Sequence, residues 1–252
     1  MRDVIRHFTV KGEMSACKRL GAGHIHETYL AETEAGRRYI LQKVNRHVFP
    51  DVDAIMENLG KLSAFLEARG RGLPMIRYLD TREGGKLYED GRGGTWRAYP
   101  FVPDSVCLQS AERGEELYQA ALAFGRYLHA LRDFPAAELG EPIPDFHNTP
   151  ARFRQLRAAL SRDAAGRRKE VEAEIAFALA REDRACTLQQ LREQGSLPLR
   201  VTHNDAKLNN VLLDADTRKA LCVIDLDTVM PGLAAYDFGD LVRSCGAQAA
   251  ED

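Results

Sequence analysis

The sequence has little that would direct the protein into a membrane or onto a nucleic acid. Its first residues, Met1–His7, contain no apolar segment, and no apolar run approaches the roughly 18 residues that a transmembrane helix requires. The formal net charge is −2, so there is no basic excess to attract phosphate backbones. We therefore expect a cytoplasmic protein whose partner is a small molecule, with no nucleic acid and no membrane involved.

Cysteine is also sparse and follows no pattern. The chain has neither a C-x-x-C pair nor the spacing of a metal site, so we expect five reduced, buried thiols: Cys17, Cys107, Cys186, Cys222 and Cys245. Hydrophobic residues make up 44% of the chain and charged residues 29%, a globular balance that argues against disorder. With 252 residues, the chain can form one large domain or two modest lobes.

The most informative stretch lies in the last fifth of the sequence. Val201–Asp214 reads as a short apolar strand, a polar loop and a second apolar strand. After a turn, Leu221–Asp227 reads as a third strand that ends in carboxylates. The polar residues of the loop follow the order H-x-D-x-K-x-x-N, which is the order of a kinase catalytic loop: His203, Asp205, Lys207 and Asn210.

These residue types suit phosphoryl transfer. The reaction needs a carboxylate that receives the proton of the acceptor hydroxyl, and oxygen ligands that hold Mg²⁺ against the phosphates of ATP. Asp205, Asn210 and Asp225 can supply these groups.

The N-terminal region predicts a β-meander with strands at Cys17–Leu20, Glu27–Glu32 and Arg38–Asn45. Gly21 and Gly23 lie between the first two strands. A glycine pair lets backbone N–H groups approach phosphates, as in the glycine-rich loop of kinases, but it is also typical of an ordinary hairpin turn.

The third of these strands is where a kinase places the lysine that holds the α- and β-phosphates. Strand alternation puts Gln42 and Lys43 on opposite faces, so one of them faces the nucleotide. The pattern aligns Gln42 with the usual lysine, and Lys43 is then either a phosphate contact or a solvated strand residue. The amphipathic helix expected at Asp51–Arg69 offers Glu57 or Asn58 near the position of the lysine's usual partner, and that contact stays unassigned.

Three further segments are expected to complete an antiparallel sheet: Arg77–Asp80, Lys86–Glu89 and Thr95–Val102. Prolines then lead the chain out of the sheet, so we place the hinge between two lobes here. In a kinase-like arrangement, the backbone of Pro100, Phe101 and Val102 would face the adenine edge.

The second half of the chain is mainly helical by its apolar spacing. Helices are expected at Ala111–Arg132 and Ala151–Leu160, and Ser161–Gln194 reads as helical, charged and mostly solvated. Between the first two, Asp145–Pro150 is a polar loop that carries His147 and most simply reads as a turn.

Together these segments resemble the aminoglycoside phosphotransferase and choline kinase superfamily, and within it they look most like the N-acetylhexosamine 1-kinases of sugar salvage. The resemblance rests on Thr202–Val211, Val223–Gly232, the glycine hairpin and Asp145–Thr149. It implies an α+β, two-lobed protein-kinase-like fold, with a small antiparallel β N-lobe (residues 1–102) and a mainly helical C-lobe (103–252). It also implies a Mg-ATP-dependent kinase that phosphorylates a sugar hydroxyl, the anomeric hydroxyl of an N-acetylhexosamine.

The resemblance assigns roles by position. Asp205 matches the catalytic base, Asn210 and Asp225 match the Mg²⁺ ligands, and Lys207 matches a phosphate-contacting lysine. His203 matches a histidine that braces the loop.

Asp237-Phe-Gly239 spells the metal motif of protein kinases, but it lies too far along the chain from Asp205, and Asp225 is better spaced. We expect Asp237 and Asp240 to brace the loop instead, near a helix N-terminus.

Three departures from the family pattern leave alternatives open. His26 stands where a smaller polar residue is expected, and Gln42 replaces the usual lysine. Members of the family continue well past the metal aspartate, so we expect either a truncated chain or an acceptor site that is partly supplied from elsewhere. The alternatives are an aminoglycoside, choline or homoserine as acceptor, or a catalytically incomplete nucleotide-binding pseudoenzyme.

Overall fold

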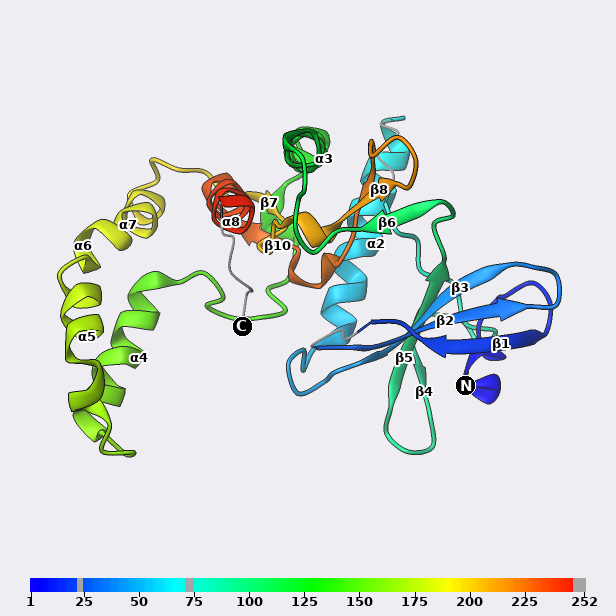
Figure 1. Ribbon diagram of the computed structural model, residues 1–252, viewed down its shortest axis with the longest axis horizontal. Coiled ribbons are helices and arrows are strands. Elements are labelled where there is room, and N and C mark those ends of the chain that lie inside the picture. The colour runs from blue at the N-terminus through cyan, green and yellow to red at the C-terminus, as the bar shows by residue number, and fades with distance from the viewer. Residues whose placement is uncertain (22–24, 71–74, 247–252) are drawn as a thin grey trace.

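A twisted antiparallel sheet forms the N-terminal part of the protein, and helices with two small sheets form the rest (Figure 1). The computed structural model describes residues 1–21, 25–70 and 75–246, and the structural statements below concern these residues. The larger β-sheet comes first along the chain and most of the helices follow it, so the predicted α+β class is confirmed.

The N-terminal sheet has the strand order β1-β2-β3-β5-β4, with every neighbouring pair antiparallel. Its strands are β1 (Met14–Arg19), β2 (Glu27–Thr33), β3 (Arg38–Val44), β4 (Tyr88–Glu89) and β5 (Thr95–Pro100). The predicted meander is therefore confirmed. The strand expected at Arg77–Asp80 is wrong, because β4 already pairs with that edge of β5 at Thr95 and Trp96. The segment reaches β5 only where the Leu79 N–H donates to the Ala98 carbonyl, at 2.8 Å.

Side chains alternate across β3 as its sequence predicts. Leu41 is buried in a small core beneath the sheet, which the short helix α1 (Arg2–Ile5) helps to close. That core consists of Ile5, Phe8, Ala31, Leu41, Trp96 and Ala98. Lys43 shares the face of Leu41 and lies over the Trp96 ring, whereas Gln42 points to the opposite face, toward Arg97.

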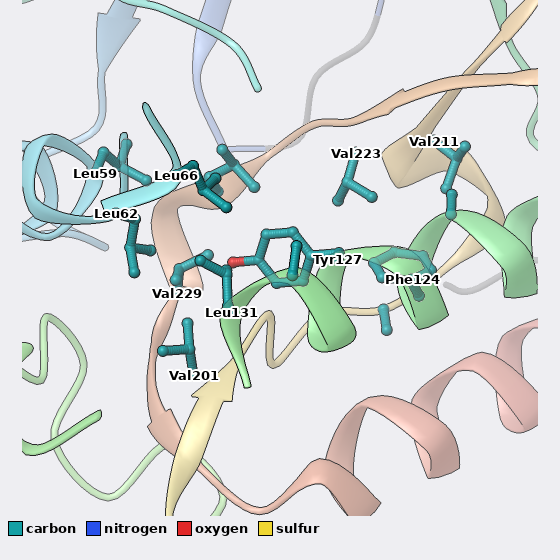
Figure 2. Packing of buried hydrophobic residues seen from close by; sticks show 14 of the residues in the cluster. Leu59, Leu62, Leu66, Phe124, Tyr127, Leu131, Val201, Val211, Val223 and Val229 are labelled. Atoms are coloured by element: carbon teal, nitrogen blue, oxygen red, sulfur yellow. The ribbon is translucent and has the colours of Figure 1, made fainter. Parts of the chain in front are cut away.

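Helix α2 (Val52–Ala68) begins at Asp51, whose side chain accepts a hydrogen bond from the Ala54 N–H at 2.9 Å. Its apolar stripe packs against α3 (Gly114–Leu131) rather than against the sheet (Figure 2). In Figure 2 the Tyr127 ring of α3 lies beside Leu131 and Val229, and Leu62 of α2 lies on the other side of Val229. The predicted helix is confirmed, and it shares one hydrophobic core with the C-terminal part of the chain.

The helical region after α3 is more broken than its sequence predicts. Helix α4 (Thr149–Arg162) ends at Asp163, which adopts a left-handed conformation with φ 38°. The expected continuous helical stretch is instead four short elements: η2 (Arg168–Val171), α5 (Glu172–Leu179), α6 (Glu182–Ala185) and α7 (Thr187–Glu193). These elements extend away from the rest of the molecule with α4, and most of their side chains are exposed (Figure 1).

Two small sheets frame the region of the predicted catalytic loop. One has the order β6-β8-β9, and in the other β7 pairs with β10. The strands are β6 (Ser105–Cys107), β7 (Arg200–Thr202), β8 (Val211–Asp214), β9 (Ala220–Val223) and β10 (Met230–Gly232). The 3₁₀ turns η1 (Ala136–Glu138), η3 (Leu208–Asn210) and η4 (Leu226–Thr228) and the helix α8 (Ala234–Gly246) complete the described elements.

Two further expectations concern the surface. In the described part of the chain, no helix has the length and apolar character needed to cross a membrane. All five cysteines are free, as expected, but only Cys186 and Cys222 are buried. Cys17 and Cys245 are half-buried, and Cys107 is exposed on the edge strand β6.

Candidate active site

The predicted catalytic loop begins directly after β7 and is fixed through its backbone. The N–H groups of His203 and Asn204 donate to the two carboxylate oxygens of Asp237, at 2.8 and 2.7 Å. Asn204 has a left-handed backbone (φ 65°), which this clamp holds in place. The predicted bracing role is therefore confirmed for Asp237, on the first turn of α8. Asp240 lies 3.6 Å from Arg243 instead.

Asp205 lies at the centre of the loop, held by two residues of the same sequence pattern. The Asn210 side-chain nitrogen donates to the Asp205 backbone oxygen at 2.8 Å and to its carboxylate at 2.9 Å. The Lys207 ammonium lies 3.3 Å from the same carboxylate oxygen. The Asp205 side chain is 26% exposed, so it is fixed by its neighbours and still open to a substrate.

Asp225 is brought next to this loop by the pairing of β8 with β9. The Ile224 N–H donates to the Asn210 carbonyl oxygen at 2.9 Å, and Asp225 follows in a left-handed conformation (φ 58°, ψ 56°). The Asp225 side chain is solvent-exposed, yet its pKa is raised by partial desolvation and then by the negative charges of Asp227 and Asp205. The site therefore gathers negative charge at one strand end.

The His203 ring links the two halves of this arrangement. Its Nε2 donates to the carbonyl oxygen of Ile224 at 2.9 Å, and its ring packs edge-on against Phe124 of α3. Nε2 therefore carries the ring proton, and the buried Nδ1 has no hydrogen-bond partner in the described chain. This position suits a brace between the loop and the strand of Asp225.

The residues present fit a Mg²⁺ site. The described chain contains no cluster of three or more His, Cys, Asp or Glu side chains that would form an all-protein metal cage. Mg²⁺ in phosphoryl-transfer enzymes is usually held by one or two protein carboxylates together with waters and substrate phosphates. The Asp225 carboxylate and the Asn210 amide oxygen are the hard oxygen donors that such a site uses. The amide nitrogen of Asn210 is already committed to Asp205, which leaves its oxygen for this role.

A buried ion pair connects the N-terminal sheet to the loop that follows Asp225. The Arg97 guanidinium on β5 donates to both carboxylate oxygens of Asp227 in η4, at 2.6 and 2.7 Å, and both side chains are 1% exposed. Burial opposes ionisation of Asp227, but Arg97 and the hydrogen bonds outweigh it and lower the pKa of the carboxyl below its ordinary value. Asp227 is therefore a buried carboxylate anion.

His26 completes this cluster. Its Nε2 lies 2.6 Å from an Asp227 carboxylate oxygen, and its Nδ1 accepts the Asn45 N–H at 3.1 Å. Since Nδ1 is an acceptor, Nε2 carries the proton and donates it to Asp227. Sequence reasoning did not find this cluster, although an arginine within the apolar strand Thr95–Pro100 and the second carboxylate of Asp225-Leu-Asp227 were available signals.

The residues expected to contact the nucleotide are divided between two faces of the sheet. Gln42 accepts from Arg97 Nε at 3.0 Å and donates to Thr28 at 3.2 Å, so it faces the Arg97–Asp227 side. Lys43 lies on the other face, 3.7 Å from Glu27. Gly21 has a positive φ of 57° and is exposed, whereas Gly23 lies outside the described residues.

The predicted hinge offers one backbone donor. Pro100 has no N–H, and the Phe101 N–H donates to the Arg38 carbonyl oxygen at 3.0 Å. The Val102 carbonyl oxygen accepts from the Ser105 hydroxyl at 2.7 Å. Within the described chain, the Val102 N–H has no partner, so it is the hinge donor that a nucleotide base can use.

The two residues of α2 that could pair with the lysine position on β3 have other partners. Glu57 forms an ion pair with Lys61 at 2.7 Å on the protein surface. Asn58 is buried and donates to the carbonyl oxygens of Gly140 and Val229, at 2.9 and 3.1 Å. Asn58 therefore ties α2 to the C-terminal part of the chain.

His147 has a more specific place than the turn that its sequence context suggests. Its Nε2 donates to the Asn204 carbonyl oxygen at 2.9 Å, and its ring packs on Tyr236, with 4.9 Å between ring centroids. Nearby, burial raises the pKa of the Asp240 carboxyl, and the charge of Asp205 adds to this effect. These groups form a polar and aromatic surface beside Asp205.

A cavity of about 460 Å³ lies between α3 and α8, apart from these groups. Its lining is apolar except for Asp237 and the Tyr118 hydroxyl, and it includes none of the predicted catalytic, nucleotide or metal residues. It offers no set of donors for phosphates.

Comparison with known proteins gives a consistent result. A family model described as the phosphotransferase enzyme family matches residues 16–252. Among solved structures, the chain is similar to the GDP and kanamycin complex of APH(2")-IIIa, with a TM-score of 0.66 and 14% identity over 97% of this chain and 77% of that one. It is also similar to the amicoumacin kinase hAmiN in complex with AMP-PNP, Ca²⁺ and Ami (0.62, 15%, 96% and 67%). A third is spectinomycin phosphotransferase APH(9)-Ia with ADP and spectinomycin (0.57, 14%, 99% and 80%). These similarities confirm the predicted kinase-like fold.

Proposed function

Because the chain belongs to the phosphotransferase enzyme family, we propose that it is a Mg-ATP-dependent kinase that phosphorylates a hydroxyl group of a small molecule. The observation that carries this proposal is the arrangement of Asp205, which Asn210 and Lys207 hold directly beside the strand end that bears Asp225. A base, a cation and one oxygen donor stand within one loop, and a second oxygen donor follows the adjacent strand β9, as phosphoryl transfer requires.

Each of these residues has a distinct role in the proposed reaction. Asp205 orients the acceptor hydroxyl and receives its proton, for which its fixed and partly exposed carboxylate is suited. Lys207 offsets negative charge on the transferred phosphoryl group. Asn210 and Asp225 hold Mg²⁺, which when bound neutralises charge on the phosphates of ATP. Catalysis is then mostly positioning and electrostatics, and the hydrogen bonds within the loop supply the positioning.

We place the adenine base against the hinge at Pro100–Val102. The Val102 N–H supports this placement because it is the hinge donor without a partner in the described chain. Gly21 lies at the turn between β1 and β2, where backbone N–H groups can approach phosphates.

The acceptor that we propose first is a sugar, with the anomeric hydroxyl of an N-acetylhexosamine as the reacting group. The support is the resemblance of Thr202–Val211 and Val223–Gly232 to the sugar 1-kinases. The surface of His147, Tyr236 and Asp240 beside Asp205 offers hydrogen-bonding groups and ring faces that a sugar can use.

A cationic acceptor is the second candidate, and one observation favours it. The negative charge of Asp205 helps to raise the pKa of the Asp240 carboxyl, after the larger effect of burial. Two neighbouring carboxylates attract an amine, and the similar solved structures include a kanamycin complex.

A coupled assay of ADP release tests these proposals. The purified chain is incubated with Mg-ATP and a panel of N-acetylhexosamines, other sugars, aminoglycosides, choline and homoserine. Product that forms only with sugars, and is acid-labile as an anomeric phosphate is, supports the first acceptor. Product that forms only with amines overturns it. Binding of Mg-ATP without turnover on any acceptor supports a pseudoenzyme and overturns the proposed activity.

A further inference from the structure

Arg97, Asp227 and His26 form a buried ionic cluster at a place that the kinase sequence pattern does not assign to an ion pair, and the kinase ion pair itself is not formed in the described chain. In protein kinases, a lysine on β3 pairs with a glutamate on the following helix, and the pair must be in place for activity. Here Gln42 stands at the expected position on β3, and the acidic candidate on α2, Glu57, pairs with Lys61 at the surface. The described chain does not form the strand-to-helix pair.

A buried cation, Arg97, nevertheless lies on β5, the strand next to β3. Arg97 lies directly opposite Gln42 in the register of β3 and β5, and its Nε–H donates to the Gln42 side-chain oxygen at 3.0 Å. Its remaining nitrogens hold Asp227, and its guanidinium lies 4.8 Å from the centroid of the Tyr78 ring. The counter-ion of this cation is therefore in the C-terminal part, two residues after Asp225.

Two residues of the N-terminal part contact the Asp227 carboxylate, and a third fixes one of them. Arg97 comes from β5, His26 directly precedes β2, and Asn45 directly follows β3 and fixes the His26 ring. Asp227 is thus held by one residue on a strand of the sheet and by one residue next to a strand. The contact fixes the loop of η4 relative to the surface where the nucleotide is proposed to lie.

This loop needs external support at Asp225. A left-handed backbone is unfavourable for an aspartate and persists only where surrounding contacts hold it. Before Asp225, the backbone of Ile224 is held by hydrogen bonds with Asn210 and His203, and after it the chain passes through Leu226 to Asp227. Asp227 is the nearest residue along the chain that is fixed by a bidentate pair.

We propose that Arg97 is a positioning residue that, through Asp227, holds Asp225 in the geometry that binds Mg²⁺ and keeps it in register with the N-terminal sheet. The inference rests on the proposed function, since it assigns Arg97 to the metal site of the same reaction. It requires the planar fork of arginine, because a lysine ammonium is a compact charge that does not present two parallel N–H donors to a carboxylate.

Calorimetry with the ATP analogue AMP-PNP tests the proposal on R97K, once with Mg²⁺ and once with EDTA. The ratio of the two dissociation constants measures how much Mg²⁺ tightens nucleotide binding, independently of turnover. Loss of a residue that orients a metal ligand typically weakens metal affinity by about 10- to 100-fold, and we expect that ratio to fall by this amount in R97K. Binding in EDTA and the KM for the acceptor should stay within about threefold of the parent, since neither depends on Asp225.

R157K is the matched control. Arg157 on α4 also forms a bidentate pair, with Glu182 on α6, at a partly exposed site far from the loop in sequence. We expect R157K to leave the Mg²⁺ ratio unchanged. A second variant, R97M with D227N, removes the charges together and keeps an oxygen that accepts from His26. This double variant tests the same prediction in case R97K does not fold because Asp227 has lost its bidentate partner.

The outcomes are distinguishable. A parent protein that shows no Mg²⁺-dependent nucleotide binding overturns the proposed function and this inference with it. A parent that binds normally, together with folded Arg97 variants whose Mg²⁺ ratio matches the parent, overturns only the assignment of Arg97. If neither variant shows a cooperative unfolding transition, the pair is a requirement of folding and the positioning role is wrong.

Discussion

Asn210 holds Asp205 with both hydrogens of one amide nitrogen, which donates to the Asp205 backbone oxygen at 2.8 Å and to its carboxylate at 2.9 Å. The geometry fixes the carboxylate and at the same time turns the amide oxygen of Asn210 away from it. One side chain can thus orient the proposed base and offer an oxygen to Mg²⁺. The spacing of five residues between them in the sequence serves this purpose, because the turn η3 brings Asn210 back onto Asp205.

Replacing the proposed base tests the first role. Asp205→Asn should lower kcat by about 10²- to 10⁴-fold, because the amide cannot accept the proton of the acceptor hydroxyl. Binding of Mg-ATP should change little, since the proposed metal donors are Asn210 and Asp225. Steady-state kinetics and calorimetry measure the two effects separately. Turnover at the parent rate in this variant would show that another group is the base.

The sequence predicted the parts of this site that lie close together along the chain. The loop from His203 to Asn210 and the strand end at Asp225 are each short, and the β8–β9 pairing that joins them follows from two apolar segments and a tight turn. The bracing by Asp237 was also predicted, because its distance from Asp205 excluded a metal role.

Contacts between distant segments could not be predicted in the same way. Arg97 and Asp227 are 130 positions apart, and nothing in the alternation of β5 says what its buried arginine meets. Likewise, Arg77–Asp80 has an apolar pattern suited to a strand, but β4 already pairs with Thr95 and Trp96 on the edge of β5 that it would need. Local patterns define which residues form elements, whereas competition for partners decides the pairing.

The clamp on the loop backbone gives a prediction about stability. Asp237→Ala leaves the buried N–H groups of His203 and Asn204 without acceptors, and hydrogen bonds to a charged group are worth about 1.5–3 kcal/mol each. We therefore expect the free energy of unfolding to fall by about 3 kcal/mol or more, measured by urea denaturation. Asp240→Ala is the control on the same helix and should cost much less, because its partner Arg243 is largely exposed. Equal losses would contradict the clamp.

Thiol reactivity gives a prediction about pH. The thiolate is the reactive form, and the pKa of the exposed Cys107 is raised above its ordinary value by partial desolvation and then by the charge of Asp225. Because the pKa is raised, less thiolate is present at pH 8 than in a free cysteine. Iodoacetamide should therefore label Cys107 more slowly than a model thiol at pH 8, and the rate should keep rising above pH 9.

Peptide mapping by mass spectrometry follows this labelling site by site. Cys222 is buried, and its pKa is raised to about 11, so it should stay unlabelled while the protein is folded. Cys107→Ser should remove the early phase of labelling. A rate that levels off below pH 8 would mean that the Cys107 pKa is not raised.

A glycine beside the loop gives the last prediction. The β7–β10 pairing brings Gly232 against the start of the loop, and a Cβ added there would lie 2.1 Å from the Thr202 hydroxyl oxygen and 2.8 Å from the Asn204 side-chain oxygen. Gly232→Ala should therefore push apart the residues that precede Asp205, at a cost of about 1–3 kcal/mol in unfolding free energy. Turnover should fall with it, since the loop that orients the proposed base is displaced.

Gly239→Ala is the matched control on α8, where an added Cβ meets nothing within 4 Å. It should leave turnover unchanged and be neutral or stabilising by up to about 1 kcal/mol, because alanine favours helix over glycine. Urea denaturation and steady-state kinetics on both variants measure the two effects. If Gly232→Ala behaved like Gly239→Ala, the close approach of Gly232 to Thr202 and Asn204 would be contradicted.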